Sequence, residues 1–274
     1  MGQALVAKAP FGIEIVALDR GALDITDARA VEQCLANVRP THVFNAAAWT
    51  AVDAAEKHEK AASVINAVAV GTVSAAARQT GARFIHLSTD FVFDGNQGRP
   101  YTVDDVPNPT CAYGRTKLAG ELAAGTDTLI VRTAWIYAPW GNNFVRTMLR
   151  LMAERSEISV VADQIGTPTY APSLASALWQ LAQTDARGVL HYTDSGVASW
   201  YDFAVAIQEE ALELGLLDCA IPILPIATAN FPTPARRPAY SVLDKALTWQ
   251  LIGGPAAHWR NGLRQMLRES CDNG

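Results

Sequence analysis

Two short motifs hold side chains that could do chemistry together: Ser88-Thr89-Asp90, and then Tyr113 with Lys117 about twenty residues later. A tyrosine and a lysine four residues apart lie on one face of a helix, one turn from each other. A phenol can protonate a carbonyl oxygen, and an ammonium beside it lowers the pKa of the phenol. A hydroxyl at the end of a preceding strand can orient the same oxygen. The sequence therefore predicts carbonyl reduction, with Tyr113, Lys117 and a hydroxyl of the Ser-Thr-Asp motif as the groups that act on the carbonyl.

The elements that must position these side chains alternate between strands and helices. Strands are expected at 13–19, 41–48, 83–88 and 128–133, and helices at 27–37 and 61–79 and around Tyr113. The Tyr-x-x-x-Lys spacing is weak evidence alone, and the hydrophobic strand that ends in Ser-Thr-Asp is what strengthens it. The alternation predicts an α/β fold with a doubly wound parallel sheet of the Rossmann type, which binds ligands at the carboxyl ends of its strands.

From about residue 140 the alternation of strands and helices becomes less regular, which suggests that the chain has two parts. Residues 1–140 are expected to form a dinucleotide-binding domain. Residues 141–274 are expected to form mainly a smaller mixed α/β substrate-binding region, with segments that return to the first domain. The helices expected in this second part span 143–154, 173–183, 200–214 and 258–269. A cleft between the two parts is the expected place for a substrate.

The chain has 274 residues, half of which are hydrophobic, and its composition limits the kinds of partner that we expect. A net charge of −5 provides no basic stripe, so nucleic acid is not an expected partner. No apolar run reaches the length of a membrane span, and the first residues lack the layout of a signal peptide, so no membrane is expected either. The four cysteines are scattered, which favours reduced thiols in a cytoplasmic protein over disulfides or a zinc site: Cys34, Cys111, Cys219 and Cys271.

Longer stretches around both motifs resemble the extended short-chain dehydrogenases, and among them the dTDP-4-dehydrorhamnose reductase family. The resemblance covers nearly the whole chain. It rests on the segments 88–95 (STDFVFDG), 113–121 (YGRTKLAGE), 18–26, 45–53 (NAAAWTAVD), 132–135 (RTAW), 141–144 (GNNF), 163–169 (DQIGTPT) and 232–241.

The resemblance implies an NADPH- or NADH-dependent reduction of dTDP-4-dehydro-6-deoxy-L-mannose to dTDP-L-rhamnose, a step in making cell-surface polysaccharide. In that reaction Tyr113 would protonate the 4-keto oxygen, and Lys117 would hold the nicotinamide ribose and keep Tyr113 acidic. Thr89 would hydrogen-bond the same oxygen, and Ser88 is more simply a strand-end cap. The residues expected to contact the nucleotide-sugar substrate are Thr89, Asp90, Trp135, Asn143 and Arg237.

A second set of residues would line the cofactor: Asp19, Arg20, Asp24, Ile25, Ala46, Ala47 and Ala48, together with Tyr113 and Lys117. A carboxylate at a strand end can meet the adenosine ribose, and Arg20 could accept a 2′-phosphate. The alternative is that Asp19 and Arg20 form only a solvated turn, so the choice between NADH and NADPH stays open.

The chain departs from the family pattern at its beginning. The family opens with a strand and a glycine-rich turn resembling TGxxGQxGxxL, whereas this sequence opens Met1-Gly2-Gln3-Ala4-Leu5 and matches only the end of that motif. The expectation is that a central strand and the turn that holds the pyrophosphate are missing, through a late start site or a natural loss. Such a chain would be marginally stable and would bind the cofactor poorly.

Several polar residues keep a second, structural interpretation. Asn66 could support the active site or be satisfied locally, and Arg236 and Arg237 could meet a diphosphate or be surface arginines. Asp53 and Glu56 are expected at a solvated helix start, and Trp49 in packing. The histidines on strand patterns, His42, His86 and His191, are expected to be core or strand-end residues, and no metal site is expected.

A non-catalytic module on the same fold is the alternative function. Such a module, resembling the regulatory subunit of methionine adenosyltransferase, would bind a dinucleotide or a partner enzyme without turnover. Retention of Thr89, Tyr113 and Lys117 favours the enzyme, and the missing glycine turn favours the module. Whether the chain forms a homodimer stays open.

Overall fold

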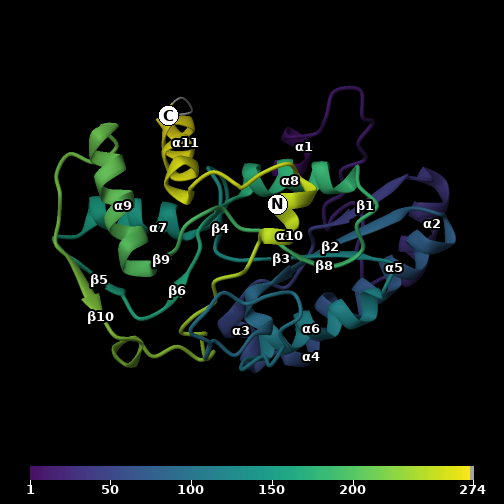
Figure 1. Cartoon of the computed structure of the whole chain (residues 1–274), viewed down its shortest axis with the longest axis horizontal. Coiled ribbons are helices and arrows are strands. Elements are labelled where there is room, and N and C mark those ends of the chain that lie inside the picture. The colour runs from purple at the N-terminus through teal and green to yellow at the C-terminus, as the bar shows by residue number, and fades with distance from the viewer. Residues whose placement is uncertain (272–274) are drawn as a thin grey trace.

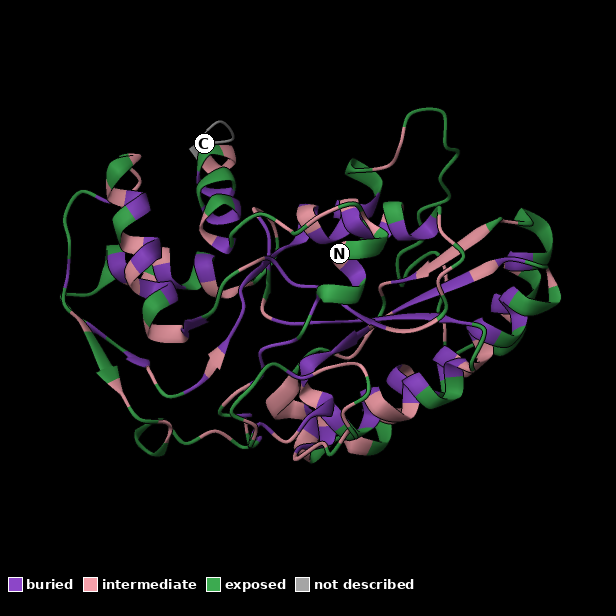
Figure 2. Cartoon of the chain, viewed as in Figure 1, coloured by how far each residue is buried: buried purple, intermediate pink, exposed green. Residues whose placement is uncertain are grey.

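A parallel sheet of four strands forms the centre of one lobe of the computed structural model, which describes residues 1–271 (Figure 1). Its order is β1 (His42–Asn45), β2 (Arg83–Thr89), β3 (Leu129–Thr133) and β8 (Gly188–His191), and each neighbouring pair is parallel. The central strands are buried on both faces, which explains why they read as continuous apolar runs (Figure 2).

Helices cover both faces of this sheet, because successive strand side chains point to opposite sides. Phe84 and Ile130 pack under α2 (Ala28–Val38), α5 (Ala69–Gln79) and α6 (Ala112–Ala124). On the other face, Ile85, Leu129 and Val131 pack under α1 (Gly2–Ala7) and α8 (Ala171–Ala182). The predicted doubly wound α/β sheet is confirmed.

The predicted strand at 13–19 is wrong. Ile13, Val16 and Leu18 lie in an irregular segment and are about half exposed, at 50%, 50% and 46%. A strand needs a neighbour for its backbone hydrogen bonds and a surface for its apolar side chains. Within residues 1–271, β1 is the edge of the sheet and no strand lies beside this segment. Residues 13–19 therefore have no strand with which to form backbone hydrogen bonds, although their residue types favour a strand.

The long Ala/Val-rich helix runs from Glu59 to Gln79 as α4 (Glu59–Ser63), a π-helical turn (Val64–Val68) and α5. By length and composition it could cross a membrane, so the expectation that no run is long enough was wrong. Half of it is buried in the structure, and its Val70 and Val73 lie in the core beside α2 and α6. This packing is that of a core helix.

The second lobe is built on three helices, α7 (Phe144–Glu154), α9 (Trp200–Glu213) and α11 (Trp259–Cys271), beside a parallel pair of strands, β5 (Ile158–Val161) and β10 (Ile223–Ile226). Their apolar faces share one core. The remaining short elements are α3 (Val52–Lys57), a 3-10 turn (Asp90–Val92), β4 (Ile136–Tyr137), β6 (Ile165–Gly166), β7 (Thr169–Tyr170), β9 (Ala198–Ser199), a 3-10 turn (Thr228–Asn230) and α10 (Ala246–Leu251).

Candidate active site

The end of β2 and the first half of α6 meet in a fixed register. His86 and Ser88, two residues apart on one side of the strand, face Lys117 and Glu121, four residues apart on one side of the helix. Lys117 Nζ lies 3.3 Å from His86 Nε2, and the Ser88 hydroxyl donates to the Glu121 carboxylate. The two periodicities therefore bring the Ser-Thr-Asp and Tyr-x-x-x-Lys motifs together.

Tyr113 and Thr89 form the polar centre of this meeting point. The Thr89 side chain lies close enough to Tyr113 to affect its pKa, and the ring of Phe91 stands edge-on to Tyr113 with 5.5 Å between the ring centres. Burial raises the pKa of Tyr113, and the neighbouring Thr89 side chain opposes that rise. The site therefore holds a protonated phenol beside a hydroxyl, which is what protonation of a carbonyl oxygen requires.

Lys117 is buried, and its Nζ donates to the carbonyl oxygen of Leu87 over 2.6 Å. Burial lowers its pKa to about 8, against an opposing influence of Glu121. The resemblance implied that Lys117 keeps Tyr113 acidic. In this structure the contacts of Lys117 are instead to Leu87 and His86 on β2.

Asp90 is an almost fully buried carboxyl group, 2% exposed, at the same strand end. Burial raises its pKa to about 6, although the nearby Ser241 and Thr89 side chains lower it. Its Oδ1 accepts from Thr89, whereas its Oδ2 has no hydrogen-bond partner among residues 1–271. A buried oxygen without a partner is costly, and a bound polar ligand would satisfy it.

Two glycines let α6 approach its neighbours closely. A Cβ on Gly114 would stand 2.2 Å from the carbonyl oxygen of Phe91, and one on Gly120 would stand 2.0 Å from that of Asn66. The Asn66 side chain is satisfied locally, because its amide bonds the backbone N–H of Trp49 at 2.8 Å and the hydroxyl of Thr116 at 3.0 Å. These bonds tie α6 to the loop after β1.

Trp135, a predicted substrate contact, lies in a strained backbone conformation with φ of 48°. Its indole stacks on that of Trp200, with 3.5 Å between ring centres and 7° between planes. A Cβ on Gly166 would stand 2.6 Å from the same indole. The Trp135 ring is therefore held against the core of the second lobe.

The other two predicted substrate contacts have protein partners. The Asn143 amide caps α7 through Arg146 N at 3.2 Å and donates to Ala138 O at 2.7 Å. Arg237 pairs with Asp53, with 3.0 Å between Nη2 and Oδ2.

Asp53 lies in the first turn of α3 with its side chain 40% exposed, as expected of a helix start, but Asp53 and Glu56 both have protein partners that the sequence did not predict. Asp53 accepts hydrogen bonds from Arg237 and from the backbone N–H of Ala235, 182 residues away. Glu56 accepts from the backbone N–H of Ala112, the first residue of α6, at 2.7 Å. Glu56 thus fastens the start of α6, where backbone N–H groups attract negative charge, and Asp53 fastens α3 to the loop that holds Ala235 and Arg237.

The predicted cofactor residues other than Tyr113 and Lys117 lie in two surface segments. Asp19 and Asp24 accept hydrogen bonds within their own turns, from Gly21 N at 2.9 Å and from Thr26 N at 3.0 Å. Arg20 is exposed and Ile25 packs partly against the core under α2. Ala46, Ala47 and Ala48 directly follow β1, at the carboxyl end of the sheet where Rossmann folds bind ligands.

Sequence reasoning missed His86, Asn45 and the buried pair of Glu121 and Arg132 as parts of this site. Arg132 donates to Glu121 through Nε at 2.9 Å and Nη2 at 2.6 Å. One signal was present: His86 lies two residues before Ser88, so both must share a face of the strand. His42, His86 and His191 do lie on strands, as expected.

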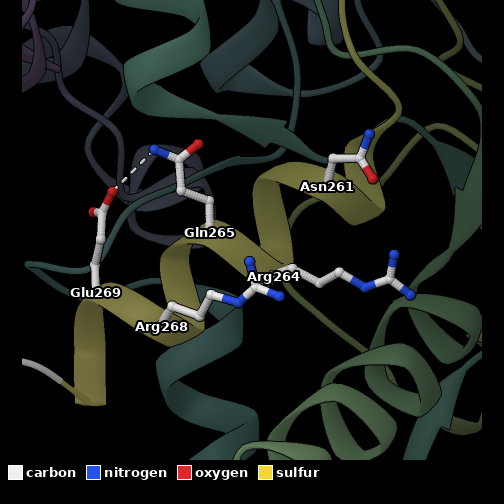
Figure 3. A pocket seen from close by; sticks show the side chains of 5 residues that line it. All are labelled: Asn261, Arg264, Gln265, Arg268 and Glu269. Atoms are coloured by element: carbon white, nitrogen blue, oxygen red, sulfur yellow. Dashed lines mark hydrogen bonds between the residues drawn. The ribbon is translucent and has the colours of Figure 1, made fainter.

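A surface groove lies along α11, apart from these residues (Figure 3). It has a volume of about 560 Å³ and is lined by Asn261, Arg264, Gln265, Arg268 and Glu269. Gln265 Nε2 donates to Glu269 Oε1 at 3.1 Å. Across residues 1–271, no group of three or more His, Cys, Asp or Glu side chains could hold a metal ion.

Comparison with known proteins gives one consistent match. The family model described as the RmlD substrate binding domain matches residues 1–271. The dTDP-4-dehydrorhamnose reductase of Escherichia coli K12 is 39% identical over 275 residues, which cover 96% of this chain and 92% of that protein. The Burkholderia thailandensis protein of the same name is 41% identical over 270 residues, or 93% and 91% of the two chains.

A solved structure agrees with these sequence matches. The crystal structure of Bacillus anthracis dTDP-4-dehydrorhamnose reductase in complex with NADP superimposes with a TM-score of 0.91. The two sequences are 37% identical, and the match covers 97% of this chain and 94% of the other.

Proposed function

The chain belongs to the RmlD substrate binding domain family, and from that premise we propose that it reduces dTDP-4-dehydrorhamnose to dTDP-L-rhamnose with NADPH. The observation that carries the proposal is that Tyr113 and Thr89 lie beside each other at the carboxyl end of β2, with Lys117 one turn away from Tyr113 on α6. Relatives that are about 40% identical and are named dTDP-4-dehydrorhamnose reductase match almost the whole chain. It is an oxidoreductase of dTDP-rhamnose biosynthesis.

The residues present fit a nicotinamide cofactor and a sugar. The small side chains of Ala46 to Ala48 allow close approach to the backbone at the end of β1, where dinucleotides bind in this fold. The unpartnered Oδ2 of Asp90 is a buried acceptor suited to a sugar hydroxyl. Asp19, Arg20, Asp24 and Ile25 are proposed to hold the adenosine side, with Arg20 free to meet a 2′-phosphate.

NADPH, when bound, supplies the hydride that reduces the C4 carbonyl of the sugar. The chain's own residues handle the oxygen. Tyr113 donates its phenolic proton to the C4 oxygen, and Thr89 donates a hydrogen bond to the same atom. Asp90 accepts from a sugar hydroxyl, and Trp135 provides an apolar wall. Lys117 holds the nicotinamide ribose.

Asn143 and Arg237 are kept as proposed substrate contacts that would have to share or exchange their present partners. For Arg237 this means leaving Asp53 for the diphosphate, a charge-assisted bond of the same kind. Asn143 could contact the substrate only by giving up part of its cap on α7.

The direct test is to incubate the purified chain with NADPH and dTDP-4-dehydrorhamnose and to identify the product by mass spectrometry and NMR. The proposal expects dTDP-L-rhamnose in an amount equal to the NADPH consumed. A parallel reaction with a 4-keto sugar attached to UDP measures nucleotide preference. Binding of NADPH without any product from either sugar nucleotide would favour the non-catalytic module instead.

We further infer that the protein works in the cytoplasm without nucleic acid or membrane partners, from its scattered cysteines and its net charge of −5. Self-association into a homodimer is a separate question that light scattering of the purified chain would answer.

A further inference from the structure

Two buried polar residues outside both motifs form a row with Lys117. Asn45 and His86 face each other across the paired strands β1 and β2, with 3.2 Å between Asn45 Nδ2 and His86 Nδ1. His86 is 0% exposed, and its other ring nitrogen, Nε2, lies 3.3 Å from Lys117 Nζ. The row thus runs from the edge strand to the candidate catalytic lysine.

The backbone of Ala47 fixes where the imidazole carries its proton. The Ala47 N–H donates to Asn45 Oδ1 over 3.1 Å, so the amide oxygen is occupied and the amide nitrogen faces the ring. An amide nitrogen can only donate, and Nδ1 of His86 must therefore accept. A neutral imidazole that accepts at Nδ1 is protonated at Nε2, and this N–H points toward Lys117.

We propose that His86, in the tautomer that Asn45 selects, is a positioning residue that donates a hydrogen bond to the neutral amine of Lys117 and so lowers the proton affinity of that lysine. A neutral amine offers one lone pair and two N–H groups. The lone pair meets His86 Nε2–H, and one N–H meets the carbonyl oxygen of Leu87 at 2.6 Å. An ammonium has no lone pair, so it would face the imidazole N–H without accepting.

The charged groups around this row do not reverse the effect of His86 on the proton affinity of Lys117. Glu121 on α6 favours the charged lysine, but its carboxylate is shared with Arg132 on β3 and Ser88 on β2. Burial holds the pKa of His86 well below its usual range, and Lys117, whenever it is charged, lowers that pKa further, so the ring is neutral. Tyr113 on α6 and Asp90 after β2 are two further titratable side chains at this end of the sheet.

The tautomer can be read in the unmodified protein, without cofactor or substrate. Nitrogen NMR of the chain labelled on its histidines distinguishes protonated from unprotonated ring nitrogens, and the loss of one signal set in His86→Gln assigns His86. We expect a proton on Nε2 and none on Nδ1 from mildly acidic to alkaline pH. A proton on Nδ1, or a ring that becomes charged in this range, would overturn the inference.

The effect on Lys117 is measured by carbon NMR of the lysine ε-carbons, since the chain has only five lysines and Lys117→Met assigns the signal. Asn45→Asp places a carboxylate opposite Nδ1, which reverses the tautomer and turns Nε2 into an acceptor for the ammonium. We expect the pKa of Lys117 to rise by about one unit or more.

Two comparisons separate the ring from the added charge. In a His86→Gln background, Asn45→Asp adds the same charge without the ring and should raise the pKa of Lys117 distinctly less. An equal rise in both backgrounds would contradict the role of His86. His191→Gln removes an equally buried histidine whose Nδ1 faces the carbonyl of Tyr101 at 3.1 Å, and it should leave the titration of Lys117 unchanged. Because the inference rests on the proposed role of Lys117 but these measurements need no turnover, an inactive enzyme and a wrong tautomer give different results.

Discussion

Glu121 and Arg132 form a two-pronged ion pair inside the first lobe, with N–O distances of 2.9 and 2.6 Å and both side chains 4% exposed. Glu121 also accepts from Ser88 and lies one turn from Lys117 on α6. The pair therefore joins α6 to β2 and β3, the elements that carry the candidate catalytic residues. Removing one partner from such a pair leaves an uncompensated buried charge.

We therefore predict that Glu121→Gln lowers the free energy of unfolding by about 3–5 kcal/mol, measured by urea denaturation. Glu59→Gln is the matched control, because it breaks a pair with Arg115 on the same helix whose side chains are 44% and 46% exposed. That change should cost less than about 1 kcal/mol. Equal losses in both variants would contradict a special role for the buried pair.

Gly120→Ala should also destabilise the protein, because its Cβ would stand 2.0 Å from the carbonyl oxygen of Asn66. Moving α6 away to relieve that contact should cost about 1–3 kcal/mol and displace Lys117. Thermal unfolding measures the first effect and the rate of NADPH oxidation the second. Gly98→Ala meets nothing within 4 Å and serves as the control; a neutral Gly120→Ala would show that α6 is not closely packed there.

Asp194→Asn should stabilise the protein at alkaline pH only. Burial raises the pKa of Asp194 to about 7, and its Oδ1 has no hydrogen-bond partner in the part of the chain that the structure describes. A raised pKa in the folded state means that stability is fully present below about pH 4 and is lost as the pH rises toward about 7. The asparagine keeps the acceptor for Tyr170 N, at 3.0 Å, without the charge.

The measurement is the difference in melting temperature between Asp194→Asn and the parent at about pH 4 and about pH 8. The difference should grow in favour of the variant by a few degrees, since one pKa unit corresponds to about 1.4 kcal/mol. A constant difference across this range would show that Asp194 does not titrate with folding.

Lys117→Met should weaken NADPH binding and lower the reductase rate about 10²-fold or more, because Lys117 is proposed to hold the nicotinamide ribose and so to place the nicotinamide against the sugar. Calorimetric titration with NADPH and initial rates check the two effects separately. Arg115→Met removes an exposed cation on the same helix and should leave both unchanged. Unaltered NADPH affinity in Lys117→Met would make the lysine purely structural.

Local signals predicted much of this fold from sequence. The Asp27 carboxylate caps α2 by accepting from Ala30 N at 3.0 Å, and helices expected at 143–154 and 200–214 occur as Phe144–Glu154 and Trp200–Glu213. In these cases the cap or the 3.6-residue period lies inside the segment itself. The motif holding Thr89 was likewise placed at a strand end, where the structure has it.

What sequence could not supply were contacts between distant segments. The strand expected at 13–19 failed because strand formation depends on a neighbour, which residue types do not specify. The tie between Asp53 and Arg237 spans 184 positions, and no local pattern announces it. The row from Asn45 to Lys117 depends on the parallel register of β1 and β2, which becomes visible only once the sheet is formed.

The central claim is that Tyr113 protonates the carbonyl oxygen, and Tyr113→Phe tests it most directly. NADPH affinity should be unchanged in this variant, whereas the rate of dTDP-4-dehydrorhamnose reduction under saturating NADPH should fall about 10²–10⁴-fold. The rate is followed by the near-ultraviolet absorbance of NADPH, and the affinity by calorimetry of the same preparation. A variant that binds NADPH normally and keeps more than about a tenth of the parent rate would contradict Tyr113 as the proton donor.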